Sequence, residues 1–124
     1  MKKGKRKINS QEKYRLIAVP TSDGVNIFPG MLGRAKYFNI YEITTDKKFG
    51  EKCILIEKRK NPYENTLQHL KTLDVHRVIS DCSIIIATKI GKKGTERLKA
   101  RNMEIRFAKG PIGSTLKNLC KSME

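Results

Sequence analysis

The apolar positions in the first half of the chain form short runs that stop at turn residues. Arg15–Pro20 is one such run, followed by the turn residues 21–24, and it predicts a buried strand. Two further runs, Tyr37–Ile43 and Lys52–Glu57, are rich in β-branched and aromatic residues and are separated by a turn sequence. They predict a β-hairpin, whereas residues 26–33, which contain the pair Pro-Gly, predict a loop.

The second half changes from hairpins to alternating helices and strands. Leucines recur at every third position within Tyr63–Leu73, which predicts a helix over this range or slightly beyond. The apolar run Ser83–Thr88 does not alternate with polar residues. It therefore predicts a strand that helices cover on both faces, at the centre of the sheet.

The last part of the chain predicts a helix, a strand and a second helix. Thr95–Arg101 consists of good helix formers that stop near Asn102, and Glu104–Ala108 alternates as a strand does. Ser114 is a candidate cap for the final helix. This order predicts an α/β domain whose sheet is antiparallel at the start and parallel where helices cross over.

The net charge of the chain predicts a strong preference for anionic ligands. The chain of 124 residues has 27 lysines and arginines against 12 acids, a formal net charge of +15. Residues 1–13 are basic and poor in apolar side chains, so we expect a disordered arm there and a single domain over residues 14–124. The field of such a domain attracts nucleic acid, phosphate or an anionic cofactor without choosing among them.

Nothing in the sequence indicates a membrane or secreted protein. No apolar run approaches the length of about 20 residues that crosses a bilayer, and Met1–Lys7 lacks the apolar segment of a secretory signal. The three cysteines, Cys53, Cys82 and Cys120, are far apart and lack the spacing of a zinc site. We therefore expect a cytoplasmic protein with reduced, mostly buried thiols.

Two strand-to-helix connections, residues 90–95 and 109–114, are candidate anion-binding loops. Both are expected at the carboxyl ends of neighbouring strands, where the N–H groups and dipole of the following helix attract anions. Gly91, Lys92 and Lys93 are the candidate residues in the first connection. The competing interpretation is that glycine only makes the turn, since the sequence fits neither a Walker A nor a dinucleotide-binding motif.

The first loop and one cysteine add further candidates. Met31, Gly33 and Arg34 lie in the loop, and Arg34 can present its planar guanidinium to an anion or pair with an acid such as Glu42. Cys82 precedes a predicted buried strand, where a thiol usually serves as a small apolar side chain. Its alternative role is that of a soft ligand for iron or copper.

No group of residues predicts catalysis. His69 and His76 are about two helical turns apart, too far to share one metal ion. The acidic residues are scattered, without a pair that fits the roles of acid and base. The chain is therefore predicted not to be an enzyme, and a hydrolase is the least favoured interpretation.

Several segments also occur in a recognisable order: Ile17–Gly24, Gly33–Ile43, Asn61-Pro62, Ser80–Ala87, Glu96–Leu98 and Glu104–Ala108. Together they resemble the dinitrogenase iron-molybdenum cofactor biosynthesis family, over roughly Leu16 to Leu119. The resemblance implies a ribonuclease H-like fold, which is a five-stranded mixed sheet flanked by helices. It also implies a protein that carries or inserts the iron-sulfur precursor or finished cofactor of nitrogenase and exchanges it with a donor or acceptor protein.

The resemblance departs from the family at the first loop. Family members commonly carry a His-Phe-Gly-Arg-Ala motif whose histidine is a proposed cluster ligand, and this chain has methionine, Met31, in place of the histidine. A thioether is a weaker ligand for iron than imidazole, but it is soft enough for copper(I) or a cluster iron. Gly33 and Arg34 are retained, so the shape and charge of the loop are expected to persist.

These observations predict a non-catalytic binding or carrier protein for an anionic iron-sulfur or iron-molybdenum cluster or its precursor. The cofactor-binding candidates are Met31, Gly33, Arg34, Gly91, Lys92 and Lys93, and Cys82 is the candidate metal ligand. The alternative is a nucleic-acid-binding basic module, which the net charge and the basic arm favour.

Overall fold

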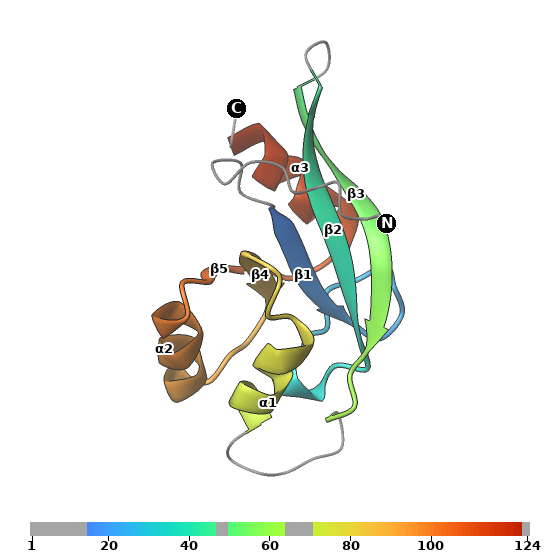
Figure 1. Cartoon of the computed structure of the whole chain (residues 1–124). Coiled ribbons are helices and arrows are strands. Elements are labelled where there is room, and N and C mark those ends of the chain that lie inside the picture. The colour runs from blue at the N-terminus through green and yellow to red at the C-terminus, as the bar shows by residue number, and fades with distance from the viewer. Residues whose placement is uncertain (1–14, 47–49, 64–70, 123–124) are drawn as a thin grey trace, which may run out of the picture.

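The computed structural model describes residues 15–46, 50–63 and 71–122, which form a domain around one sheet (Figure 1). The five strands lie in the order β3-β2-β1-β4-β5. They are β1 (Leu16–Thr21), β2 (Tyr37–Asp46), β3 (Gly50–Lys60), β4 (Ile84–Ala87) and β5 (Glu104–Phe107). The first three strands pair antiparallel, whereas β1, β4 and β5 run parallel, so the predicted mixed sheet is confirmed.

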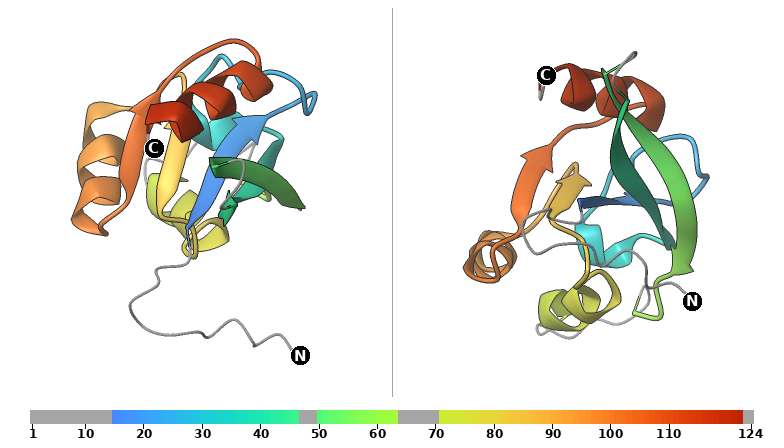
Figure 2. Two further views of the ribbon diagram at one scale, coloured as in Figure 1. Left: turned by 90° about the horizontal axis from the view of Figure 1, so that it is seen from above. Right: turned by 45° about the horizontal axis from the view of Figure 1, so that its top comes forward.

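Helices cover both faces of this sheet. In the described part of the chain they are η2, a 3-10 helix (Leu32–Arg34), α1 (Lys71–Val78), α2 (Lys92–Ala100) and α3 (Ile112–Ser122). α3 covers one face, and α1 and α2 cover the other (Figures 1 and 2). The α/β class with helical flanks is confirmed, while the ribonuclease H-like label rests on the resemblance. Across the described residues, no helix combines the length and the apolar composition that a membrane span requires.

β1 is buried on both of its faces. All six of its residues are buried, and successive side chains point to opposite sides of the sheet. Leu16 and Ala18 pack under α1 and α2, whereas Ile17 and Val19 pack under α3. β4 divides its side chains in the same way. The prediction that the apolar run containing β4 forms the centre of the sheet is wrong, because β1 occupies that position and β4 lies beside the edge strand β5.

The first predicted elements are present, but their ends differ. Both hairpin strands extend beyond their apolar runs because the pairing runs from Asp46 with Gly50 to Tyr37 with Lys60. α1 continues to Val78, since Val75 and the following Ile79 are buried. Tyr63 lies in a turn and not in the predicted helix. The rest of the predicted helix start, residues 64–70, and the predicted arm over residues 1–13 lie outside the described residues.

The last two helices begin earlier than predicted. α2 begins at Lys92 and not at Thr95, and α3 begins at Ile112 and not after Ser114. In each case the carbonyl of the residue before the helix accepts a hydrogen bond from the N–H four positions later. Residues assigned to loops therefore form the first helical turns, and Ser114 lies inside α3 and does not cap it.

β3 is an edge of the sheet and exposes three consecutive apolar side chains. Ile54, Leu55 and Ile56 are 43%, 52% and 44% exposed. The register between β2 and β3 shifts between Ile40 and Tyr41, where two residues of β3 lie opposite one residue of β2. Ile56 is the additional residue of this β-bulge, which locally bends and twists the strand.

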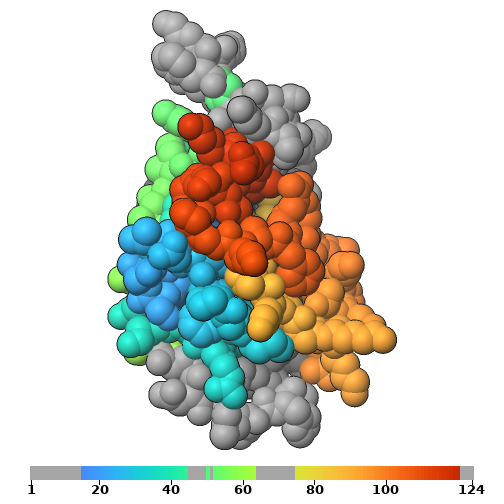
Figure 3. Space-filling model, turned by 180° about the vertical axis from the view of Figure 1, so that it is seen from behind, coloured from blue at the N-terminus to red at the C-terminus, as the bar shows by residue number. Residues whose placement is uncertain are grey.

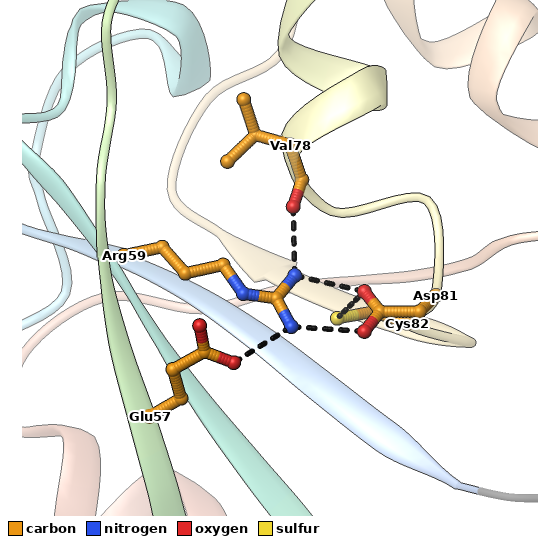
Figure 4. Close-up of polar contacts among 5 residues, drawn as sticks. All are labelled: Glu57, Arg59, Val78, Asp81 and Cys82. Carbon is orange, nitrogen blue, oxygen red and sulfur yellow. Dashed lines mark hydrogen bonds and ion pairs between the residues drawn. The ribbon is translucent and has the colours of Figure 1, made fainter.

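An ion pair joins β3 to the segment between α1 and β4. Arg59 is 18% exposed, and its guanidinium donates to both carboxylate oxygens of Asp81 at 2.8 Å (Figure 4). It also donates to the Val78 carbonyl at 2.7 Å and to Glu57 at 2.9 Å. These contacts hold the pKa of Asp81 below its usual range, chiefly through the hydrogen bonds from Arg59. The edge strand is thereby attached to the helical layer by a fork of charged hydrogen bonds.

We expect the Asp81→Asn substitution to lower the free energy of unfolding at neutral pH by about 1 kcal/mol in urea denaturation. The difference from wild type should shrink as the pH falls through the lowered pKa of Asp81, because the wild-type carboxylate then loses its charge too. Glu57→Gln is the control with a smaller expected effect, since it leaves the fork intact. A difference that does not depend on pH would contradict this account of the pair.

Candidate functional site

Three chain segments meet beyond the carboxyl ends of β1, β4 and β5. They are residues 22–36, residues 88–91 and residues 108–111, and we call their meeting place the junction. Because these strands run parallel, their carboxyl ends lie at the same edge of the sheet. Isolated bridges pair Asn26 with Pro111 and Met31 with Lys89, so the long first segment touches both others. Figure 3 shows the three segments side by side, in blue to cyan, yellow and orange-red.

A turn fixes the start of the first segment. The Thr21 hydroxyl donates to the Asn26 carbonyl at 2.7 Å and accepts the N–H of Gly24 at 2.9 Å. The Asp23 carboxylate accepts the N–H groups of Asn26 and Val25, and these hydrogen bonds lower the pKa of Asp23 to about 2. Gly24 has a φ of +79°, in the left-handed region that favours glycine. The turn therefore uses its carboxylate to hold backbone.

Met31 connects the first segment to the segment after β4. The Leu32 N–H donates to the Lys89 carbonyl at 2.9 Å, next to the bridge between Met31 and Lys89. The Met31 methyl carbon lies 3.5 Å from the position that a Cβ on Gly91 would occupy. Met31 is nevertheless 42% exposed. A soft thioether side chain therefore lies at the surface beside the bare backbone of Gly91.

Gly91 precedes α2 in a conformation that does not require glycine. Its φ of −62° and ψ of 158° are extended values that any residue adopts, and an added Cβ would make only an ordinary contact with Met31. The interpretation that glycine serves only to make the turn is therefore not supported at this position. No side chain caps the N-terminus of α2, whose first turn carries the exposed Lys92 and Lys93. The N–H groups of that turn thus have no side-chain acceptor from a cap.

Asn61 holds the turn that precedes β2. Its side chain is fully buried, and its NH2 group donates to the carbonyls of Gly33 at 3.0 Å and Ala35 at 2.8 Å. Its Oδ1 accepts the N–H of Tyr63 at 3.0 Å. These contacts fix the backbone on both sides of Arg34, which remains exposed. In the sequence, Asn61-Pro62 was noted only as one of the segments that carry the family resemblance, so this positioning role was missed.

Basic side chains dominate the junction and the first turn of α2. The exposed ones are Arg34, Lys36, Lys89, Lys92, Lys93 and Lys109. The one acidic residue within the three segments is Asp23, whose carboxylate accepts backbone N–H groups. Glu42 lies opposite Leu16, at the other end of β1 from Arg34. The predicted alternative of an Arg34–Glu42 pair is therefore wrong, and the exposed positive charge at the junction favours an anion.

Cys82 lies away from the junction. It is buried at the amino end of β4, whereas the junction lies at the carboxyl end of that strand. Burial and the neighbouring Asp81 carboxylate raise the pKa of the Cys82 thiol to about 12 (Figure 4). Over the described ranges, no three or more His, Cys, Asp or Glu side chains gather closely enough to hold a metal ion. A ligand role for Cys82 stays a prediction, separate from the residues at the junction.

The structure thus brings into contact, at Met31 and Gly91, the two loops that contain the six predicted cofactor-binding residues and that lie far apart in the sequence. These residues are Met31, Gly33 and Arg34 from the first loop, with Gly91, Lys92 and Lys93 from the start of α2. The contact between the loops is a finding of the structure. The role of the six residues in binding a ligand stays a prediction.

A family model described as "Dinitrogenase iron-molybdenum cofactor" matches residues 13–122 of the chain. None of the curated proteins compared with the chain matches it. The apo form of the orange protein from Desulfovibrio gigas is 18% identical, with a TM-score of 0.66 over 87% of this chain and 88% of that one. These figures describe a similarity of fold.

Two other solved structures have lower TM-scores over similar shares of the chain. A Thermotoga protein described as a candidate NifB protein is 19% identical, with a TM-score of 0.57 over 86% of this chain and 88% of that one. A candidate dinitrogenase from Methanocaldococcus jannaschii is 14% identical, with a TM-score of 0.59 over 88% and 90% of the two chains. At such identities the likeness again concerns the fold alone.

The Asn61→Asp substitution tests the contacts that hold the turn before β2. It preserves size and the acceptor for Tyr63, but it replaces the two N–H donors with an oxygen that repels the carbonyls of Gly33 and Ala35. We expect the free energy of unfolding to fall by about 2–4 kcal/mol in urea denaturation. Asn118→Asp, on the exposed side of α3, should change it by less than about 0.5 kcal/mol. Equal effects of the two substitutions would show that Asn61 does not hold the turn.

An NMR titration tests the turn at Asp23. The amide protons of Val25 and Asn26 should shift with a midpoint at about pH 2, because both donate to the titrating carboxylate. Asp23→Asn should abolish this transition. A midpoint close to the ordinary aspartate value of about 4 would mean that the turn does not form in solution.

Proposed function

The chain belongs to the dinitrogenase iron-molybdenum cofactor family, and on that premise we propose that it binds or carries an anionic iron-sulfur or iron-molybdenum cluster, or a precursor, without catalysing a reaction. The observation that carries the proposal is the junction. It combines exposed cations, an exposed thioether and bare backbone at one edge of the sheet. These are complementary to an anionic, sulfide-rich cargo.

The cations supply most of the attraction in this proposal. Arg34 offers a planar fork of donors, whereas Lys92 and Lys93 act as point charges at the start of α2. The first-turn N–H groups and the dipole of α2 add a further preference for negative charge. Because Asn61 fixes the backbone around Arg34, binding orders the Arg34 side chain but not the loop that carries it.

Met31 and the two glycines shape the contact with the cargo. The thioether of Met31 is a soft donor that suits copper(I) or a cluster iron better than a hard cation. The absence of a side chain at Gly91 lets a cluster approach the backbone next to Met31. The Gly33 carbonyl accepts a hydrogen bond from Asn61, so Gly33 helps to hold the conformation of the loop.

A carrier neither makes nor consumes its cargo, so the proposal includes exchange with a cluster donor or acceptor protein. The cargo is held at the surface, where a second protein can reach it. A cluster held by electrostatic attraction, spread over many contacts, is released to a second protein more readily than a cluster enclosed by thiolate ligands. Cys82 lies outside this exchange surface, and we propose no transfer through it.

The test is anaerobic reconstitution of the full chain with iron and sulfide, or with isolated cofactor, followed by metal analysis and visible absorption. The triple variant Arg34→Gln, Lys92→Gln, Lys93→Gln should bind at least about tenfold more weakly, since it loses three charged contacts. A charge-matched control, Lys52→Gln, Lys99→Gln, Lys117→Gln, removes exposed lysines outside the junction and should bind nearly as wild type does.

Two results would overturn the proposal. One is wild-type protein without bound metal or visible absorption after reconstitution. The other is an equal loss of binding in the two triple variants, which would mean that net charge and not the junction attracts the cargo. Tight binding of duplex DNA that weakens steeply with salt, in a protein that takes up no cluster, would support the nucleic-acid alternative instead.

A further inference from the structure

Two cysteines that are 67 positions apart in the sequence meet at the α3 side of the sheet. Cys53 lies on the edge strand β3 and Cys120 in the last part of α3, and their Sγ atoms are 3.0 Å apart. Both residues are thiols in the structure. A disulfide requires the two sulfurs to approach to about 2.0 Å, so a shift of about 1 Å separates the observed arrangement from a covalent bond.

We propose that Cys53 and Cys120 form a reversible disulfide by exchange with a low-molecular-weight disulfide. In the first step the Cys53 thiolate attacks one sulfur of the oxidant, giving a mixed disulfide and releasing one thiol. In the second step the Cys120 thiolate attacks Cys53 Sγ and displaces the other thiol. Two protein thiols are oxidised to one disulfide, the oxidant is reduced to two thiols, and the two protons move to the released thiolates.

Two separate parts of the fold, the sheet and α3, position the two sulfur atoms in contact. Cys53 faces Ile43 across the β2–β3 ladder, so its position is set by the sheet. Cys120 is buried and follows Leu119, which with Leu116 packs α3 onto the sheet. Cys53 itself is only half-buried, which leaves it accessible to a small oxidant. The exposed member of the pair is therefore the one that reacts first.

The third cysteine cannot substitute for either member. Cys82 packs in the cluster under α1 and α2, whereas Cys53 packs against the cluster under α3, so the sheet lies between them. Burial also raises the pKa of Cys82 to about 12, which leaves little of the reactive thiolate at neutral pH. Oxidation is therefore confined to one pair, and Cys82 serves as an internal control.

The bond would tie the edge strand to the end of α3 and close a long loop of the chain. Closing a long loop restricts the unfolded chain and stabilises the folded one. Cys53 lies opposite Ile43, near the amino end of β1, whereas the junction lies beyond the carboxyl end of β1. Oxidation therefore leaves the junction intact and changes the stability of the edge strand and α3.

The experiment equilibrates the reduced full chain with buffers of reduced and oxidised glutathione, then unfolds it and alkylates the remaining thiols. Mass spectrometry should show that one of the three cysteines, Cys82, is alkylated and that a disulfide links the peptides of Cys53 and Cys120. Thermal unfolding of the oxidised form should shift upward by on the order of 10 °C relative to the reduced form. Addition of dithiothreitol should reverse both changes.

Single substitutions separate this pair from general oxidation. Cys82→Ser should form the disulfide as wild type does, whereas Cys53→Ser, a change on the half-buried edge strand, should abolish both the bond and the thermal shift. Circular dichroism of Cys53→Ser verifies that the fold is retained. Three alkylated cysteines at every glutathione ratio, or a disulfide that involves Cys82 or joins two chains, would overturn the proposal.

Discussion

The arrangement of the whole domain depends on the burial of β1 between two hydrophobic clusters. A strand covered on both faces has to satisfy its backbone groups through neighbouring strands, because water does not reach them. β2 does this in antiparallel pairing and β4 in parallel pairing. The parallel pairing requires connections that return across the sheet, and these bring the carboxyl ends of β1, β4 and β5 to one edge. The place of the junction follows from this constraint and not from the residues that line it.

At the junction, different side chains supply the shape and the charge. Thr21, Asp23 and Asn61 use their polar groups to hold backbone, and all three contacts lie within or beside the first segment. The lysines and Arg34 at the surface contribute little to that framework. The positive field can therefore change by substitution without loss of the loop conformation. Selection for a different anion can act on the same scaffold for the same reason.

Local patterns predicted the order of the five strands and three α-helices but not their ends, because the alternation and length of apolar runs depend only on neighbouring residues; the 3-10 helix η2 lies in a predicted loop. They did not distinguish β1 from β4 as the central strand, since both are covered on two faces. The six residues at the junction were predicted from glycines, charge and a family resemblance. Asn61 was missed because its acceptors lie 26 and 28 positions away, and Cys53 with Cys120 because 67 positions separate them. Periodicity indicates which face a residue occupies but not which distant residue it meets.

The bulge in β3 has a consequence for how the protein behaves at high concentration. Among the described residues, β3 has a strand neighbour on one side only, and it exposes Ile54, Leu55 and Ile56; this combination promotes addition of strands from other molecules and growth of fibrils. The additional residue at Ile56 interrupts the regular spacing of the outer backbone groups, so an incoming strand matches them on one side of the bulge but not on both. The irregularity thus limits ordered self-association along an edge whose side chains alone would favour it.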